Sequence, residues 1–108
     1  MSVRVMYVVR ISVPVKIEEQ WNRWHDQEHI PHVLAQPGFL QVRKFRCISN
    51  DVNEAEYFVL YELQNQAAYS RYVKSDEGER LRQEYLDAYG PQTKITRYAW
   101  QETLHLIK

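Results

Sequence analysis

The sequence predicts an α+β fold of the ferredoxin-like βαββαβ type, in which one antiparallel sheet carries its helices on one face. Two observations predict it. The hydrophobic period changes five times along the chain, in the order strand, helix, strand, strand, helix, strand. The chain has 108 residues, of which 44% are apolar and 26% charged, and this composition is typical of a globular domain. We therefore expect residues 1–108 to form one domain with a four-stranded sheet and two helices.

Four segments are expected to be strands because β-branched and aromatic side chains are frequent in them. These segments are Val3 to Val13, Phe39 to Ile48, Glu56 to Leu63 and Thr93 to His105. Pro14 ends the first segment, and the turn Pro37-Gly38 precedes the second. A polar hairpin loop at residues 49–53 is expected to join the second segment to the third.

The first helix is expected from Ile17 to about His29, where apolar residues recur at helical spacing. Pro31 lacks the backbone N–H that a helix interior needs, so it is expected to break or kink this helix. A second helical region is expected in two pieces. Its capping and stop residues are Asn65 for the first piece, Ser75 or Asp76 for the second, and Gly90-Pro91 at the end.

The strands carry apolar side chains on both faces, although two helices can cover only one face of a sheet. In the first strand, Val5, Tyr7 and Val9 alternate with Met6 and Val8. A large exposed apolar face is an aggregation liability in a monomer. We therefore expect a homodimer whose two sheets pack face to face.

The charge balance bears on possible partners. The sequence has 14 lysine and arginine residues and 14 aspartate and glutamate residues, so its formal charge is balanced. A protein that binds nucleic acid needs a surface on which basic residues are in excess. No apolar run is long enough to span a bilayer, so neither a nucleic acid nor a membrane is an expected partner. The N-terminus has no export signature, and the single cysteine, Cys47, cannot form an intrachain disulfide. A cytoplasmic location is the resulting expectation.

The candidate chemistry is concentrated in the first helix. At about 100° per residue, Glu28 falls about 20° and Trp24 about 60° from Trp21. His25 falls about 40° and His29 about 80° from Trp21 on the other side. Imidazoles that titrate near neutrality would then lie beside a carboxylate and indole rings that exclude water. This pattern indicates a proton-transfer site.

Other interpretations of the same residues stay open. Glu28 at the boundary of the apolar stripe would reach solvent, with the histidines partly exposed. The pattern His25-x-x-Glu28-His29 also matches an inverted zinc-protease motif. For the third ligand that a zinc hydrolase needs, only His32, the distant His105 and acidic residues are available, so no metal is expected. The sequence contains no glycine-rich phosphate loop, and no nucleotide cofactor is expected.

The segment Trp21-x-x-Trp24-x-x-x-Glu28-His29-Ile30-Pro31, followed by Pro37-Gly38-Phe39, resembles the first helix and second strand of the dimeric α/β-barrel superfamily, and within it the EthD-like group. The resemblance implies that His29 occupies the position of the group's characteristic histidine, which in several relatives faces a cavity between sheet and helices. Relatives often carry an aromatic residue at the position of His25. Haem-binding relatives use a histidine on a later helix, and residues 64–90 contain none, so haem is not expected.

The function predicted from these features is cofactor-free proton transfer, leading to isomerisation, cyclisation or elimination, on a small aromatic or polyketide-like carbonyl compound. His29 is the candidate general base or acid, with Glu28 or His25 as its orienting or charge-stabilising partner. The expected substrate-binding walls of a mostly apolar pocket are Trp21, Trp24 and Tyr7. Two alternatives are a cofactor-free monooxygenase of the same fold and a non-catalytic protein that binds small molecules.

Overall fold

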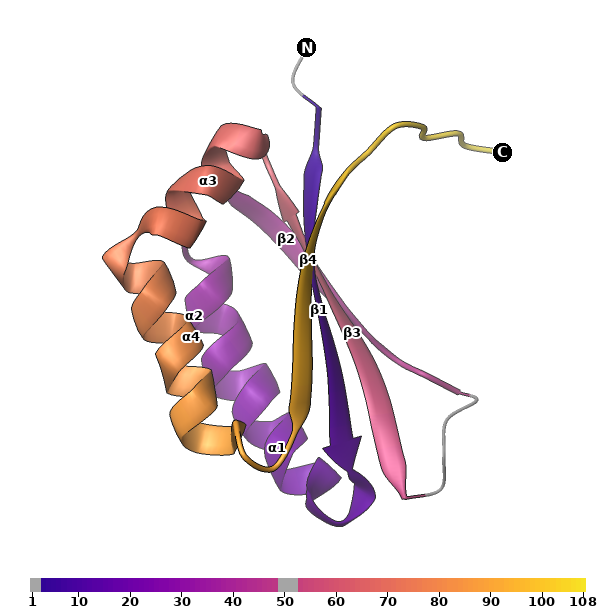
Figure 1. Cartoon of the computed structure of the whole chain (residues 1–108). Coiled ribbons are helices and arrows are strands. Elements are labelled where there is room, and N and C mark those ends of the chain that lie inside the picture. Colours follow the sequence, from indigo (N-terminus) through magenta and orange to yellow (C-terminus); the bar gives the residue numbers. More distant parts are fainter. Residues whose placement is uncertain (1–2, 49–52) are drawn as a thin grey trace.

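The four strands form one antiparallel sheet in the order β2-β3-β1-β4 (Figure 1). The computed structural model describes residues 3–48 and 53–108. Within these residues the strands are β1 (Val5–Pro14), β2 (Phe39–Arg46), β3 (Glu54–Leu63) and β4 (Lys94–Gln101). The predicted α+β, ferredoxin-like fold is confirmed, with each strand shifted by a few residues from its expected ends. The expected hairpin loop at 49–53 lies outside the described residues except for Asn53.

The central strands set which side chains face the helices. β1 pairs with both β3 and β4, so that Val9 lies opposite Val59 on one side and Arg97 on the other. Successive side chains of a strand point to opposite faces. Tyr7 and Ile11 therefore share the face of Val9, and all three are buried beneath the helices.

The helices all lie on one face of the sheet (Figure 1). They are the short 3-10 helix η1 (Val15–Ile17), α1 (Glu18–Trp24), the π-helical turn η2 (His25–His29), α2 (Ile30–Leu34), α3 (Gln66–Lys74) and α4 (Asp76–Tyr89). The expected two-piece helical region is α3 and α4. The side chain of Asn65 caps α3 by accepting from the N–H of Ala68 at 2.9 Å, and Ser75 caps α4 by accepting from the N–H of Gly78 at 2.9 Å.

The first helical run does not stop at its proline: of the two predicted effects of Pro31, a break or a kink, the break does not occur. The run continues from Glu18 to Leu34 through the π-helical turn, in which the N–H of Ile30 bonds to the carbonyl of His25. In a regular α-helix a proline ring collides with the carbonyl four residues earlier. The wider turn directly before it relieves that collision, and Pro31 lies in the first turn of α2, where a missing N–H costs little.

The core lies between the sheet and the helices. Its largest fully buried side chains include Trp21, Tyr85, Ile11, Leu63 and Leu81. No helix of the described residues covers the opposite face, where large side chains remain exposed. They are Phe45, Phe58, Tyr98 and Trp100, between 37% and 57% exposed. Across residues 3–48 and 53–108, no helix has the length and apolar character to cross a membrane.

Candidate active site

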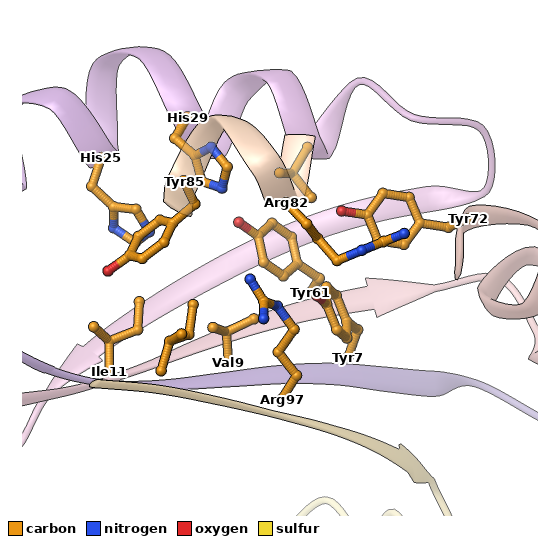
Figure 2. A pocket seen from close by; sticks show the side chains of 12 residues that line it. Tyr7, Val9, Ile11, His25, His29, Tyr61, Tyr72, Arg82, Tyr85 and Arg97 are labelled. Carbon is orange, nitrogen blue, oxygen red and sulfur yellow. The ribbon is translucent and has the colours of Figure 1, made fainter. Parts of the chain in front are cut away.

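A small cavity lies between the first helical run, α4 and the sheet (Figure 2). Its volume is about 20 Å³, room for about one water molecule. The residues around it comprise four aliphatic side chains, four tyrosines, two histidines and two arginines. They are Val9, Ile11, Val33, Ile95, Tyr7, Tyr61, Tyr72, Tyr85, His25, His29, Arg82 and Arg97. The cavity is tight, and its wall combines aliphatic and aromatic side chains with the polar groups of the histidines and arginines.

His29 enters the cavity from the end of η2 and is 8% exposed. Its Nδ1 lies 3.1 Å from Oε1 of Glu84, which is provided by α4. A carboxylate only accepts hydrogen bonds, so Nδ1 carries the ring proton and Nε2 keeps its lone pair. Among the described residues, no donor bonds to that Nε2. Burial lowers the pKa of His29, and the hydrogen bond that its Nδ1–H donates to Glu84 opposes this shift only in part.

His25 lines the same cavity, but its Nδ1 contacts a hydrogen-bond donor, whereas the Nδ1 of His29 contacts an acceptor. Nζ of Lys44, from β2, lies 3.0 Å from its Nδ1, and also contacts Oδ1 of Asn22 at 2.7 Å and Oδ1 of Asp26 at 2.6 Å. An ammonium group only donates, so Nδ1 of His25 accepts and the ring proton lies on Nε2. Burial and then the charge of Lys44 lower the pKa of His25 to about 2. The ring is neutral at physiological pH and offers one N–H.

The π-helical turn aligns these rings. A π-helical turn holds more residues than the 3.6 of an α-helix, so residues four positions apart return to nearly the same side. The rings of His25 and His29 are 5.9 Å apart at an interplanar angle of 17°, and Trp21 stacks on His25 at 4.4 Å. The same change turns Glu28 outward, where it is exposed. The prediction that Glu28 shares the tryptophan face is wrong, and the carboxylate beside His29 is Glu84.

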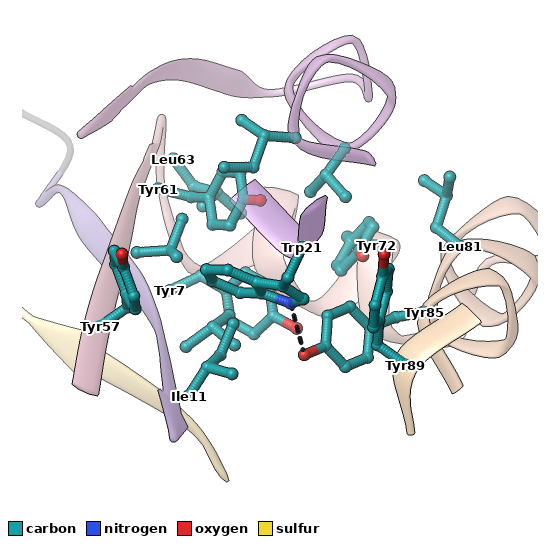
Figure 3. Packing of buried hydrophobic residues seen from close by; sticks show 14 of the residues in the cluster. Tyr7, Ile11, Trp21, Tyr57, Tyr61, Leu63, Tyr72, Leu81, Tyr85 and Tyr89 are labelled. Carbon is teal, nitrogen blue, oxygen red and sulfur yellow. Dashed lines mark hydrogen bonds between the residues drawn. The ribbon is translucent and has the colours of Figure 1, made fainter. Parts of the chain in front are cut away.

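The two tryptophans support the site from behind instead of lining it. Trp21 is fully buried, and its Nε1–H donates to the hydroxyl of Tyr85 at 3.2 Å (Figure 3). Trp24 stacks on the outer side of His29, with ring centroids 5.1 Å apart. Of the three predicted substrate-binding residues, only Tyr7 contributes to the cavity wall.

Sequence reasoning missed Glu84, Lys44 and both arginines of the cavity. Arg97 had a signal, because it follows Ile95 by two positions in β4 and so shares its inward face. Glu84 and Lys44 come from elements far from the histidines in the chain, and no local pattern marks them. Within the described part of the chain, no three His, Cys, Asp or Glu side chains gather as a metal-binding group.

A family model described as "Domain of unknown function (DUF4286)" matches residues 4–103, nearly the whole chain. The chain belongs to this family. A search among curated proteins finds no match to this DUF4286 sequence.

Solved structures share the fold of this DUF4286 chain. An EthD family protein from Bacillus halodurans has a TM-score of 0.69 at 12% identity, over 92% of this chain and 99% of that one. HapK from Hahella chejuensis has a TM-score of 0.69 at 11% identity, over 96% and 97%. SnoaB from Streptomyces nogalater, described as a cofactor-independent oxygenase, has a TM-score of 0.63 at 15% identity, over 99% and 100%. The predicted resemblance to EthD-like proteins is confirmed at the level of the fold.

Proposed function

We propose that this protein is a cofactor-independent enzyme that transfers a proton next to the carbonyl group of a small compound bound in the cavity. One observation carries the proposal: a buried imidazole, His29, whose Nδ1–H is held by Glu84 while Nε2 keeps a lone pair. An oriented base of this kind is what general-base catalysis requires. The tyrosine-lined wall suits a small aromatic or polyketide-like substrate.

The first step needs no cofactor. Nε2 of His29 takes a proton from the carbon beside the carbonyl, the C–H electron pair forms a carbon–carbon double bond, and the carbonyl oxygen becomes an enolate oxygen. Glu84 stabilises the imidazolium that results. Return of the proton to another carbon completes an isomerisation. Alternatively, the enolate expels a leaving group in an elimination, or attacks a second carbonyl in a cyclisation.

His25 supplies the complementary group. Its Nδ1 accepts from Lys44, so its Nε2–H remains available to donate to a developing enolate oxygen. A neutral, buried imidazole donor of this kind stabilises negative charge without transferring its own proton. The two histidines would thus act as base and oxyanion donor.

The first test is solvent deuterium exchange, because it needs no knowledge of the natural product. A panel of aromatic and polyketide-like ketones, keto esters and keto acids is incubated with the protein in heavy water, and exchange beside the carbonyl is followed by NMR. We expect His29→Gln to lower the exchange rate by about 10²–10⁴-fold on any compound the wild type accepts. His32→Gln is the matched control, because His32 also lies near Glu84, at 3.5 Å, but is exposed. Exchange that persists in His29→Gln, or a panel that the wild type leaves unexchanged, would contradict the proposal.

A second candidate is cofactor-free oxygenation, which the likeness to SnoaB favours. The same base would then deprotonate a phenol or quinol that reacts with oxygen. Oxygen uptake separates the two candidates, because proton transfer alone consumes none.

We also propose that the protein acts as a homodimer. The sheet face opposite the helices carries Phe58 at its centre and Trp100 at its edge strand, both exposed in the single chain. Packing against the same face of a second copy would bury them. The cavity of each subunit lies on the helix side, so this contact leaves it accessible.

A further inference from the structure

The cavity contains two guanidinium groups that the proton-transfer step does not use. Arg97 projects from β4 and Arg82 from α4, and both are partly exposed (Figure 2). Arg82 donates to the carbonyl of Val73 at 3.1 Å and lies 5.3 Å from the ring centre of Tyr72. These contacts position its head group without neutralising its charge.

Neither arginine has an acidic partner. In residues 3–48 and 53–108, no carboxylate lies within ion-pair distance of Arg97 or Arg82. Some of the other arginines in the described residues are paired closely, for example Arg10 with Glu56 at 2.6 Å. Glu84, which contacts the cavity residue His29, is directed to that histidine, to His32 and to Arg80.

The rest of the wall is uncharged at neutral pH. Burial lowers the pKa of both histidines, which favours their neutral forms. Burial also raises the pKa of Tyr7 and the pKa of Tyr72, so these hydroxyls stay protonated. The cavity therefore carries net positive charge. Positive charge in a partly desolvated site is unfavourable until an anion compensates it.

We propose that Arg97 and Arg82 bind a carboxylate of the substrate, so that the enzyme acts on small carbonyl compounds that are also carboxylic acids. The inference deepens the proposed function and rests on it. Guanidinium groups match the geometry of a carboxylate and form two parallel hydrogen bonds with it. Uncharged ketones of the same shape would leave the two charges without a partner.

The arrangement also orients the substrate. His25 and His29 lie toward one end of the cavity, Arg82 lies toward the other with Tyr72, and Arg97 lies between them (Figure 2). A carboxylate at the arginine end would place the adjoining carbonyl group toward the histidines. Because the cavity has room for only about one water molecule, the arginine side chains must shift to admit a ligand. They are partly exposed, unlike the buried histidines and Tyr7, and so are the part of the wall freest to move.

The test compares charged and uncharged probes of the same size. Binding of benzoate, benzamide, acetate and acetamide is measured by NMR titration at constant ionic strength. We expect the wild type to bind each carboxylate more tightly than its amide. We expect Arg97→Gln to weaken carboxylate binding about tenfold to a hundredfold and to leave amide binding unchanged. Arg82→Gln should act in the same direction, and Arg97→Lys should keep part of the affinity.

Arg71→Gln is the matched control, since it removes one positive charge from an exposed position on α3 and should change nothing. The NMR spectrum of each variant verifies that it is folded. Amides that bind as tightly as carboxylates, carboxylates that do not saturate the wild type, or full affinity in Arg97→Gln would overturn the inference. Repeating the titration in His29→Gln separates the two proposals. In that variant, carboxylate binding should persist while deuterium exchange is lost. If the wild type exchanges neutral ketones and shows no preference for anions, only the inference about the arginines is contradicted.

Discussion

At the scale of single residues, the surroundings of His25 and His29 give two like side chains different roles. An ammonium group contacts Nδ1 of His25, and a carboxylate contacts Nδ1 of His29. One ring is therefore left with an N–H and the other with a lone pair. A hydrogen-bond acceptor and a hydrogen-bond donor thus arise from one helical run because each ring has a different partner, Lys44 or Glu84.

The burial of His25 and His29 makes the stability of the fold depend on pH. The pKa of His25 is about 2 in the folded chain and about 6.5 when unfolded, so the unfolded state binds more protons below pH 6.5. Stability is therefore fully present above pH 6.5 and falls as the pH decreases toward the folded pKa. His29 contributes in the same direction, because its pKa is lowered too. Between pH 7 and pH 5 we expect a loss of about 2 kcal/mol from His25 alone, measured by urea unfolding.

Two variants isolate this effect. His25→Phe cannot titrate, so its stability should change by about 2 kcal/mol less than that of the wild type over the same pH interval. His105→Gln, at an exposed position, should keep the wild-type slope. An unchanged slope in His25→Phe would show that another group is responsible.

At the scale of elements, one π-helical turn decides which side chains reach the cavity. The side-chain directions predicted at about 100° per residue agree with the structure as far as His25 and disagree with it after that residue. The wider turn brings His29 into line with His25 and moves Glu28 to the surface. Such turns occur often at functional sites. In this protein the turn moves the carboxylate of Glu28 away from His29, and the carboxylate beside His29 is that of Glu84 on α4.

The turn into β2 depends on a close approach to α3. Gly38 has a φ of 85°, and a Cβ added there would lie 2.5 Å from the Cβ of Ala68. Gly38→Ala should therefore lower the free energy of unfolding by about 2 kcal/mol or more, from the left-handed conformation and from the collision. Urea unfolding at neutral pH measures this.

A double-mutant cycle identifies the collision. Ala68→Gly removes the opposing methyl group, so Gly38→Ala should cost less in that background. Ala67→Gly is the matched control, since it has a similar helix-propensity cost at an exposed neighbouring position. Equal costs of Gly38→Ala in both backgrounds would mean that only the backbone conformation matters.

At the scale of the whole molecule, the two faces of the sheet differ. One face is buried under all the described helices, while the other exposes Phe45, Phe58, Tyr98 and Trp100. Exposed aromatic side chains grouped on one sheet face are typical of an interface. The proposed homodimer would place this face in the middle of the assembly and the two cavities outside.

Sedimentation equilibrium tests the assembly. We expect the wild type to sediment as a dimer at micromolar concentration and Phe58→Glu to sediment as a monomer, because the substitution would bury an unpaired carboxylate. Leu86→Glu is the matched control, because Leu86 has the same 44% exposure but lies on α4, and it should stay dimeric. A wild type that is monomeric throughout would refute the homodimer.

Much of the fold is predictable because its signals are local. Strand and helix periods, the cap at Asn65 and the turn at Gly38 each depend on a few neighbouring residues. The candidate site is predictable only in part. The inward position of His29 follows from the apolar stripe and from the family resemblance. Its partner Glu84 is 55 positions away in the sequence, and no local pattern links the two.

The amino-acid sequence by itself determined the order of elements, the apolar strand faces and the helix that carries both histidines, since these depend on short-range periodicity. Only the tertiary structure decided that Lys44, Glu84 and Arg97 meet that helix, and that Glu28 does not face inward. The physical reason is that tautomer, charge and access depend on groups brought together by packing from different strands and helices.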